Sequence, residues 1–376
     1  MPPLVVFHLR NSDRLGGPER LILDQAVRAA EDVRPVIGSF VRDGVPNAFL
    51  DEARRLGLAV APIAQRHSYD PRVIRHVRDA ITIVGANVLV GHDYKANLVL
   101  ARAARGTGVP RVALVHGYTA ENWKIRLFER IDRRRLARAD AVVVVSESVR
   151  DAALSAGTPG ARIHLIENGI DVERVAAEAA AGRAGVRREF GIGETEVLAM
   201  SIGRLSPEKG HRVLLDAWRR LGEAAPRLVL VGDGASRAEL EAIAARLPEG
   251  RVTFAGWRAD PTACVGAADL AILPSLTEGL PLALLEAMAA GTAVVATGVG
   301  GMPKALDEGG CGLVVPPGDA TALANAIEEL ADSADGRKRL ARAARQTVRE
   351  RYDVGRQARE LEVLYRGLYE DHPASR

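Results

Sequence analysis

Short apolar runs recur along the whole chain, and each is separated from the next by a stretch of a dozen or so residues with helical character. In the first half these runs are LVVFHL, RPVIGSF, VLVGHD, RVALVHG, AVVVVS and RIHLIEN. In the second half they are VLAMSIG, RLVLVGDG, RVTFAG, LAILPS, AVVAT and CGLVV. Runs that are apolar throughout are typical of parallel strands covered by helices on both faces. The pattern therefore predicts an α/β protein with two parallel sheets.

The length of the chain also favours two domains, because 376 residues exceed what one hydrophobic core usually organises. Between the two series of runs lies GIDVERVAAEAAAGRAG, residues 169–185, which is rich in Gly and Ala and poor in large apolar residues. We expect the linker in this segment. The N-terminal domain is then expected over residues 1–170 and the second domain over 171–355.

Cysteine content and hydropathy exclude several classes of protein. Two cysteines, Cys264 and Cys311, do not support a disulfide framework or a thiolate metal site. The N-terminus has no basic start and too short an apolar run for a signal peptide, and every long apolar run is broken by Gly, Pro or charge. We therefore expect a cytoplasmic protein with no membrane-spanning helix.

Charge is distributed unevenly along the chain, although the net charge is only +3. Residues 1–170 hold 25 Lys and Arg against 18 Asp and Glu, and residues 171–376 hold 26 against 30. Much of the basic excess lies in KIRLFERIDRRRLAR, residues 124–138. This segment is either a solvated helix face or a surface for an anionic membrane. A nucleic-acid partner is disfavoured, because no aromatic stacking pattern or nucleic-acid-binding motif accompanies the charge.

Ligands of open parallel sheets bind beyond the carboxyl ends of the strands, so the residues that follow each run are the candidate site residues. Gly16 and Gly17 follow the first run and precede Pro18. They form either a tight turn or an anion site at a helix start. His92 and Asp93 lie at the end of the third run, and the fourth run ends in His116 and Gly117. A lone histidine is more often structural, but His116 lies on the expected ligand edge.

Two cations follow the first strand of the second half. Arg204 comes directly after SIG, and Lys209 lies five residues later at the expected start of a helix. A lysine there opposes the helix dipole unless an anion offsets it. Arginine gives bidentate hydrogen bonds to phosphate oxygens and lysine supplies a compact point charge. The pair predicts a diphosphate site.

Two glutamates stand in the apolar stretch SLTEGLPLALLEAMAAGTAVVAT. Glu278 is expected in the loop after a strand, and Glu286 about a turn and a half into a helix that starts near Pro281 and stops at Gly291. A carboxylate accepts two hydrogen bonds at once, which matches the vicinal hydroxyls of a ribose for Glu286 and of a second sugar for Glu278.

The helix start beside Glu278 offers backbone donors as well. The amides of Gly279 and Leu280 can bind phosphate between the two sugars.

These residues resemble the retaining, nucleotide-sugar-dependent glycosyltransferases of family 4. The resemblance covers almost the whole chain and rests on GGPER, HGYTAENW, VSESVRD, ENGID, GRLSPEKG, LVGDG and EGLPLALLE, in the order of the family. It implies the GT-B fold, in which two Rossmann-like domains face each other across a cleft, and a C-terminal helix over 356–376 that packs back toward the N-terminal domain. Two segments depart from the family pattern. GGMPK has Lys304 where the family often has Glu, and ENG has Glu167 where the family often has Pro.

The resemblance also implies roles for the candidate residues. Arg204 and Lys209 would bind the donor diphosphate, Glu286 the ribose, Glu278 and His116 the transferred sugar. Gly17, with Gly16 beside it, would lie near the phosphates, and the donor base near Gly232 and Arg258. No metal and no cofactor would be needed.

The implied reaction transfers a sugar with retention from a nucleoside-diphosphate sugar to a glycan or lipid-linked acceptor, as in the synthesis of envelope polysaccharide or glycolipid. Two alternatives remain open. A nucleotide-sugar epimerase can share the fold, and a non-catalytic protein could bind the nucleotide sugar without turnover.

Overall fold

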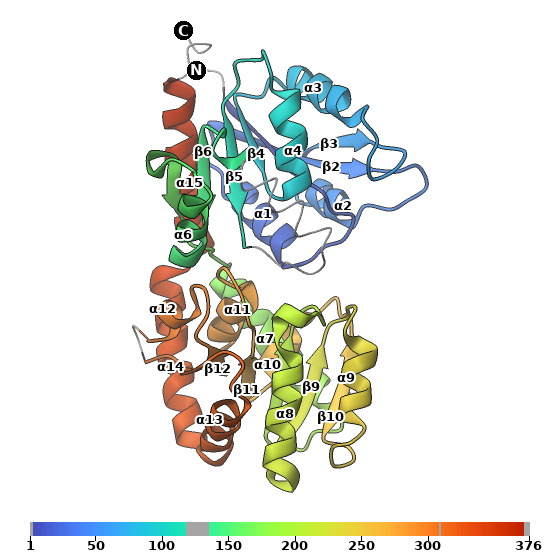
Figure 1. The fold of residues 1–376 in the computed structure, drawn as a ribbon, viewed down its shortest axis with the longest axis vertical. Helices are drawn as coiled ribbons and strands as arrows, with labels where there is room; N and C mark the ends of the chain where they lie inside the picture. The colour runs from blue at the N-terminus through green and yellow to red at the C-terminus, as the bar shows by residue number, and fades with distance from the viewer. Residues whose placement is uncertain (1–2, 118–134, 308–309, 372–376) are drawn as a thin grey trace. The chain divides into compact units, whose positions relative to one another are not determined.

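The computed structural model describes residues 3–117, 135–307 and 310–371. The described chain forms two compact units, each built on a parallel sheet with helices around it (Figure 1). Unit 1 contains residues 3–117, 135–168 and 354–371, and unit 2 contains residues 169–307 and 310–353. The α/β fold with two parallel sheets that the sequence predicts is confirmed.

The sheet of unit 1 has seven strands in the order β3-β2-β1-β4-β5-β6-β7. Its strands are β1 (Leu4–Arg10), β2 (Val33–Val41), β3 (Ala59–Ala64), β4 (Val88–Gly91), β5 (Arg111–Val115), β6 (Ala141–Val144) and β7 (Ile163–Leu165). The helices of this unit are α1 (Gly17–Val27), α2 (Ala48–Arg55), α3 (Val73–Val84), α4 (Tyr94–Ala103), α6 (Glu147–Ser155) and α15 (Val354–Glu370). Consecutive neighbours in this order all pair in parallel.

Strand β3 is absent from the strands expected from sequence. It contains Pro62, and it lies at the edge of the sheet, where a proline costs no hydrogen bond on the open side. Its burial alternates, so it lacks the continuous apolar run that marks the central strands. The pattern that predicts buried parallel strands therefore does not predict this edge strand.

Helices cover both faces of the unit 1 sheet. Helices α3 and α4 share one core cluster with Phe7 and Leu9 of β1. On the other face, Leu361 and Tyr365 of α15 join a cluster with strands β1, β4, β5 and β6. Figure 1 shows α15, in red, beside the strands of this unit. The last described helix thus completes the core of unit 1.

The sheet of unit 2 has six strands in the order β10-β9-β8-β11-β12-β13. Its strands are β8 (Leu198–Ile202), β9 (Arg227–Val231), β10 (Val252–Gly256), β11 (Leu270–Leu273), β12 (Ala293–Thr297) and β13 (Leu313–Val315). Its helices are α7 (Val172–Glu189), α8 (His211–Leu221), α9 (Arg237–Ala244), α10 (Pro261–Ala267), α11 (Leu282–Ala290), α12 (Met302–Asp307), α13 (Ala320–Asp332) and α14 (Ala334–Arg351). All six strands coincide with runs expected from sequence.

The chain passes from unit 1 to unit 2 between Asn168 and Gly169, at the start of the segment 169–185 where the sequence predicts a linker. Most of that segment is not an extended linker, however, because it forms helix α7. Its small residues serve close packing against α10. A Cβ on Gly182 would lie 2.3 Å from the Cβ of Ala263, and one on Gly266 would lie 2.5 Å from the carbonyl oxygen of Ala179. Composition rich in Gly and Ala marks a close helix–helix contact here.

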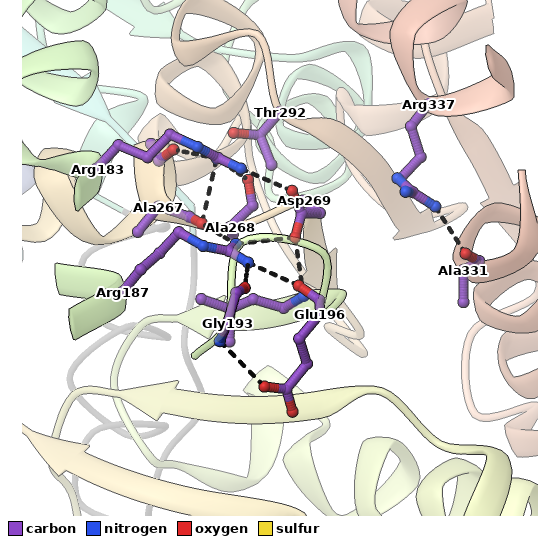
Figure 2. Close-up of polar contacts among 12 residues, drawn as sticks. Arg183, Arg187, Gly193, Glu196, Ala267, Ala268, Asp269, Thr292, Ala331 and Arg337 are labelled. Carbon is purple, nitrogen blue, oxygen red and sulfur yellow. Dashed lines mark hydrogen bonds and ion pairs between the residues drawn. The ribbon is translucent and has the colours of Figure 1, made fainter. Parts of the chain in front are cut away.

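Two arginines of α7 fix the amino ends of the central strands of unit 2 (Figure 2). Arg183 and Arg187 pair with the two carboxylate oxygens of Asp269, at 2.8 and 3.0 Å. Asp269 directly precedes β11, and it also accepts the Leu198 amide at the start of β8, at 2.9 Å. One carboxylate therefore ties β8, β11 and α7 together.

The basic segment 124–138 falls mostly outside the described residues, which resume at residue 135. Within its described end, Leu136 is buried in a cluster with β5 and β6, and Arg138 is exposed. Across the described parts of the chain, no helix has the length and apolarity needed to cross a bilayer.

Candidate functional site

The unit 2 sheet changes direction between β8 and β11. The chain leaves β8 through α8 toward β9 on one side, and it leaves β11 through α11 toward β12 on the other. The loops that follow these two neighbouring strands therefore diverge, and such a point is where open parallel sheets bind their ligands. Arg204 and Lys209 lie on the first loop, and Glu278 lies on the second.

Lys209 and Glu278 form an ion pair at this point. The Lys209 Nζ is 2.5 Å from the Glu278 Oε1, and the Ser275 hydroxyl donates to the same oxygen at 2.8 Å. The side chains of Lys209 and Glu278 are 24% and 11% exposed, so the pair is largely withdrawn from water. The structure thus brings together the cation expected on the phosphate and the carboxylate expected on the sugar.

Lys209 ends a short 3-10 turn, Pro207–Lys209, and α8 begins two residues later. Helix α8 does not begin at Lys209 because the next residue, Gly210, adopts a left-handed conformation with φ +68°. A Cβ at this position would lie 2.0 Å from the carbonyl oxygen of Pro274. Glycine therefore lets the loop after β8 touch the loop after β11, and this contact places Lys209 beside Glu278.

Arg204 is more open, with a side chain that is 44% exposed. Its Nη2 lies 3.5 Å from the Oε1 of Glu208, which also accepts the Ser206 hydroxyl at 2.6 Å. Sequence reasoning missed Glu208, although an acid between two cations in RLSPEK was a usable signal. Glu208 is buried beside Arg204 and helps to fix the direction of that guanidinium.

Helix α11 has the limits expected from sequence, with Pro281 as its N-cap and Gly291 as a left-handed C-cap. Glu286 is half-buried on this helix. Gly279 and Leu280 precede the N-cap, and the carbonyl of Gly279 accepts the Gly301 amide at 2.6 Å.

The loop after β12 also approaches this helix start closely. A Cβ on Gly300 would lie 2.3 Å from the Gly279 carbonyl oxygen and 2.5 Å from that of Glu278. Glycine at this position therefore allows the loop after β12 to pack directly against the backbone of Glu278 and Gly279.

Gly232 and Arg258 lie at the other end of the same sheet edge. Gly232 has φ +136°, and a Cβ there would lie 1.9 Å from the carbonyl oxygen of Gly203. The Arg258 guanidinium pairs with Glu189 at 2.6 Å and with Asp260 at 2.8 Å, and these acids raise its pKa. Since both of its partners are internal to unit 2, contact between Arg258 and a donor base stays a prediction.

The unit 1 sheet changes direction between β1 and β4. The Glu19 carboxylate on α1 forms an ion pair with Arg10 of β1 and accepts the Gly16 amide at 3.0 Å. The Gly16 amide is thus already used inside the protein, whereas Gly17 is the first residue of α1. Glu19 is a second residue that sequence reasoning missed, although it belongs to the GGPER motif.

His116 directly follows β5, and its surroundings keep it uncharged. Burial lowers the pKa of His116 to about 3, the positive charge of Arg10 adds to this effect, and a hydrogen bond with Asn168 opposes it. Within the described chain, the His116 Nε2 is a buried atom with no hydrogen-bond partner. Such an atom costs about 1–3 kcal/mol unless something binds it, so a ligand hydroxyl would be a suitable partner.

The low pKa values of the buried His116 and His8 side chains predict how the stability of the protein depends on pH. Burial also lowers the pKa of His8 to about 4, while a free imidazole titrates near 6.5. Below pH 6.5 the unfolded chain binds protons on these histidines that the folded protein does not bind. The free energy of unfolding should therefore decrease as the pH drops toward 4. Each group removes up to about 1.4 kcal/mol per pH unit in this window.

Urea unfolding between pH 7.5 and pH 5 measures this dependence. In the His116→Gln variant, the free energy of unfolding should fall less steeply with decreasing pH than in the wild type. The difference in slope should correspond to about one proton fewer taken up on unfolding. Equal slopes for the two proteins would contradict the neutral state of His116.

Among the described residues, no group of three or more His, Cys, Asp or Glu side chains is arranged to hold a metal ion. At the β8–β11 point lie the side chains of Arg204 and Lys209 and the start of helix α11.

The chain is similar in sequence to known glycosyltransferases. The family model described as Glycosyltransferase Family 4 matches residues 15–174, and the one described as Glycosyl transferases group 1 matches residues 196–333. The GDP-mannose-dependent alpha-(1-6)-phosphatidylinositol monomannoside mannosyltransferase of Mycobacterium tuberculosis is 30% identical over 345 residues, which cover 85% of this chain and 86% of that protein. The chain belongs to glycosyltransferase family 4.

Other relatives of this glycosyltransferase extend the comparison. The alpha-D-kanosaminyltransferase of Streptomyces kanamyceticus is 29% identical over 281 residues, covering 70% of this chain and 72% of that protein. The crystal structure of Anabaena Alr3699/HepE in complex with UDP-glucose superposes with a TM-score of 0.84 at 24% identity, covering 97% of this chain and all of that one. That likeness shows the shared GT-B fold.

Proposed function

We propose that this glycosyltransferase moves a hexosyl group, with retention, from a nucleoside-diphosphate sugar to a hydroxyl acceptor without a bound metal ion. The observation that carries the proposal is the placement of two cations, Arg204 and Lys209, after β8, with Lys209 paired to Glu278 after β11, where the two loops of a parallel sheet diverge. Two similar proteins support the donor class, because one is a GDP-mannose-dependent mannosyltransferase and the crystal structure of the other contains UDP-glucose.

Chemistry at the donor follows from these charges. As the bond between C1 of the sugar and the phosphate oxygen breaks, negative charge grows on the diphosphate. Arg204, Lys209 and the amides at the start of α11 would stabilise that charge. The acceptor hydroxyl forms the new bond to C1 from the same face, and the departing phosphate oxygen takes its proton.

His116 would contact the transferred sugar as a neutral group. Positive charge develops at C1 as the leaving group departs, and an imidazolium beside it would repel that charge. A buried imidazole that stays uncharged at physiological pH can instead hydrogen-bond a sugar hydroxyl through its Nε2, which no other described residue contacts by a hydrogen bond.

Release of free nucleoside diphosphate tests the proposal. The protein is incubated with a panel of nucleoside-diphosphate sugars, chosen by thermal shift, and the products are followed by NMR. Slow release of diphosphate, unchanged by EDTA, is expected of a metal-independent transferase that lacks its acceptor. An isomerised donor would show an epimerase instead, and binding without either product would show a non-catalytic nucleotide-sugar-binding protein.

The two glutamates should separate in binding experiments. Glu286→Ala should weaken the free nucleoside diphosphate, since this residue is proposed to hold the ribose. Glu278→Ala should leave that affinity nearly intact and reduce transfer, since its proposed partner is the sugar. Calorimetry with the diphosphate alone measures the difference. An equal loss of binding in both variants would mean that the roles are divided wrongly.

For the acceptor we propose a lipid-linked or envelope glycan, reached through peripheral attachment of the basic segment 124–138 to an anionic membrane. The protein should then sediment with anionic vesicles at low salt, be released at high salt, and ignore neutral vesicles. If it stays in the supernatant with anionic vesicles at low salt, the membrane hypothesis is wrong and the segment is a solvated face.

A further inference from the structure

Three neighbouring strands of unit 1, β1, β4 and β5, each carry a histidine at the carboxyl end. His8 lies in β1, while His92 and His116 follow β4 and β5 directly. Each lies two positions after a residue of the same buried cluster, namely Val6, Val90 and Leu114. Because side chains alternate along a strand, the three histidines continue the face of the sheet that α15 covers.

The three imidazoles form a contiguous column, defined here as His8, His92 and His116. The Nδ1 of His8 lies 3.0 Å from the Nε2 of His92, and their rings are stacked with centroids 5.3 Å apart. The His92 and His116 rings are inclined by only 20°, with centroids 6.2 Å apart. His92 is 3% exposed, so it stands between the core and the half-buried His116.

The groups around the imidazole column favour its neutral form. Arg10 of β1 lies close enough to lower the pKa of both His92 and His116, and its own charge is paired with Glu19 of α1. Asn168, after β7, acts in the opposite direction, because its hydrogen bond with His116 raises the pKa of that imidazole.

At the other end of the column, Tyr365 of α15 meets the His8 ring edge-on at 6.2 Å. Burial raises the pKa of this phenol, so it remains uncharged too. A hydrogen bond between two buried imidazoles needs one N–H and one lone pair, which two neutral rings supply.

We propose that His92, held by His8, is a positioning residue that keeps His116 desolvated, oriented and uncharged for its contact with the transferred sugar. The inference rests on the proposed function only for the contact between His116 and the transferred sugar. Without the His92 ring, water would reach the inner side of His116, and the largest cause of its low pKa would be lost. His116 would then become a cation in mildly acidic solution, beside the carbon where positive charge develops.

The experiment compares the wild type with His92→Ala, His92→Gln and His92→Phe. The His116 ring is titrated by nitrogen NMR between pH 5 and pH 8, and donor turnover is measured over the same range. In the wild type His116 should not titrate. In the Ala and Gln variants its pKa should rise toward 6.5, so that kcat at pH 5.5 falls about tenfold below its value at pH 8. The KM for the donor should stay unchanged.

Two variants serve as controls. His92→Phe keeps a buried ring against His116 and should retain the flat pH profile, which separates burial from any general damage to the fold. His164→Gln, at a half-buried histidine of β7 outside the imidazole column, should behave as the wild type.

A His116 ring that stays untitrated in the Ala and Gln variants would overturn the inference. Full turnover in His116→Ala would instead overturn the proposed sugar contact, while the NMR titration would still decide whether His92 keeps His116 neutral.

Discussion

Replacing Arg204 or Lys209 by alanine is expected to lower glycosyl transfer by about 100-fold or more, because each change would remove a preorganised positive charge that we propose to stabilise the leaving diphosphate. The fold should survive, since both residues lie on the loop after β8 and their side chains are 44% and 24% exposed. Initial rates of diphosphate release measure the effect.

Arg212 provides the matched control for these variants. It lies on α8 close to Lys209 in sequence, but its side chain is 77% exposed and pairs with Glu239 on the surface. Arg212→Ala should retain the wild-type rate. Wild-type turnover in both Arg204→Ala and Lys209→Ala would contradict the diphosphate site.

The ion pair with Glu278 adds a further expectation for Lys209. In the Lys209→Ala variant, Glu278 loses its cation, so the effects of Lys209→Ala and Glu278→Gln should not add. A double-mutant cycle on kcat measures this coupling, which is a consequence of the 2.5 Å contact and was not foreseeable from the positions of the two residues in sequence.

Asp269→Ala is expected to destabilise unit 2 by about 3–5 kcal/mol, as for removal of one partner from a buried ion pair. The Arg187 side chain is only 8% exposed and would remain in place with its charge uncompensated. The amide of Leu198 would also lose its acceptor at the start of β8. Urea unfolding followed by the fluorescence of Trp218, which is buried in unit 2, measures the loss.

Glu239→Ala is the control for this stability experiment. It removes a carboxylate from an ion pair whose two side chains are 77% and 53% exposed, and such pairs contribute at most about 1 kcal/mol. A loss of similar size in Asp269→Ala and Glu239→Ala would show that the Arg183–Arg187–Asp269 cluster does not hold the central strands.

The sequence predicts the two sheets and the sheet edge where the candidate site residues lie, because both follow from short-range patterns. Central parallel strands are apolar throughout, and the residues after them must lie at one edge of the sheet. This is sufficient to bring Arg204, Lys209 and Glu278 to the same edge. It also explains the failure at β3, an edge strand that contains Pro62 and alternates in burial.

Contacts between distant segments could not be predicted in this way. The approach of Gly210 to Pro274 places Lys209 on Glu278, although the pattern around either residue says nothing about the other. The small residues of α7 suggested a linker because their partner, the backbone of α10, is invisible in the local sequence. The imidazole column likewise depends on strand order, which no single run reveals.

A crystal structure with a bound nucleoside diphosphate, UDP or GDP according to which gives the larger thermal shift, tests the central claim most directly. The diphosphate is expected at the carboxyl ends of β8 and β11, within hydrogen-bond distance of Arg204, Lys209 and the amides that begin α11. The ribose should lie against Glu286. A nucleotide whose diphosphate touches neither Arg204 nor Lys209 would contradict the claim.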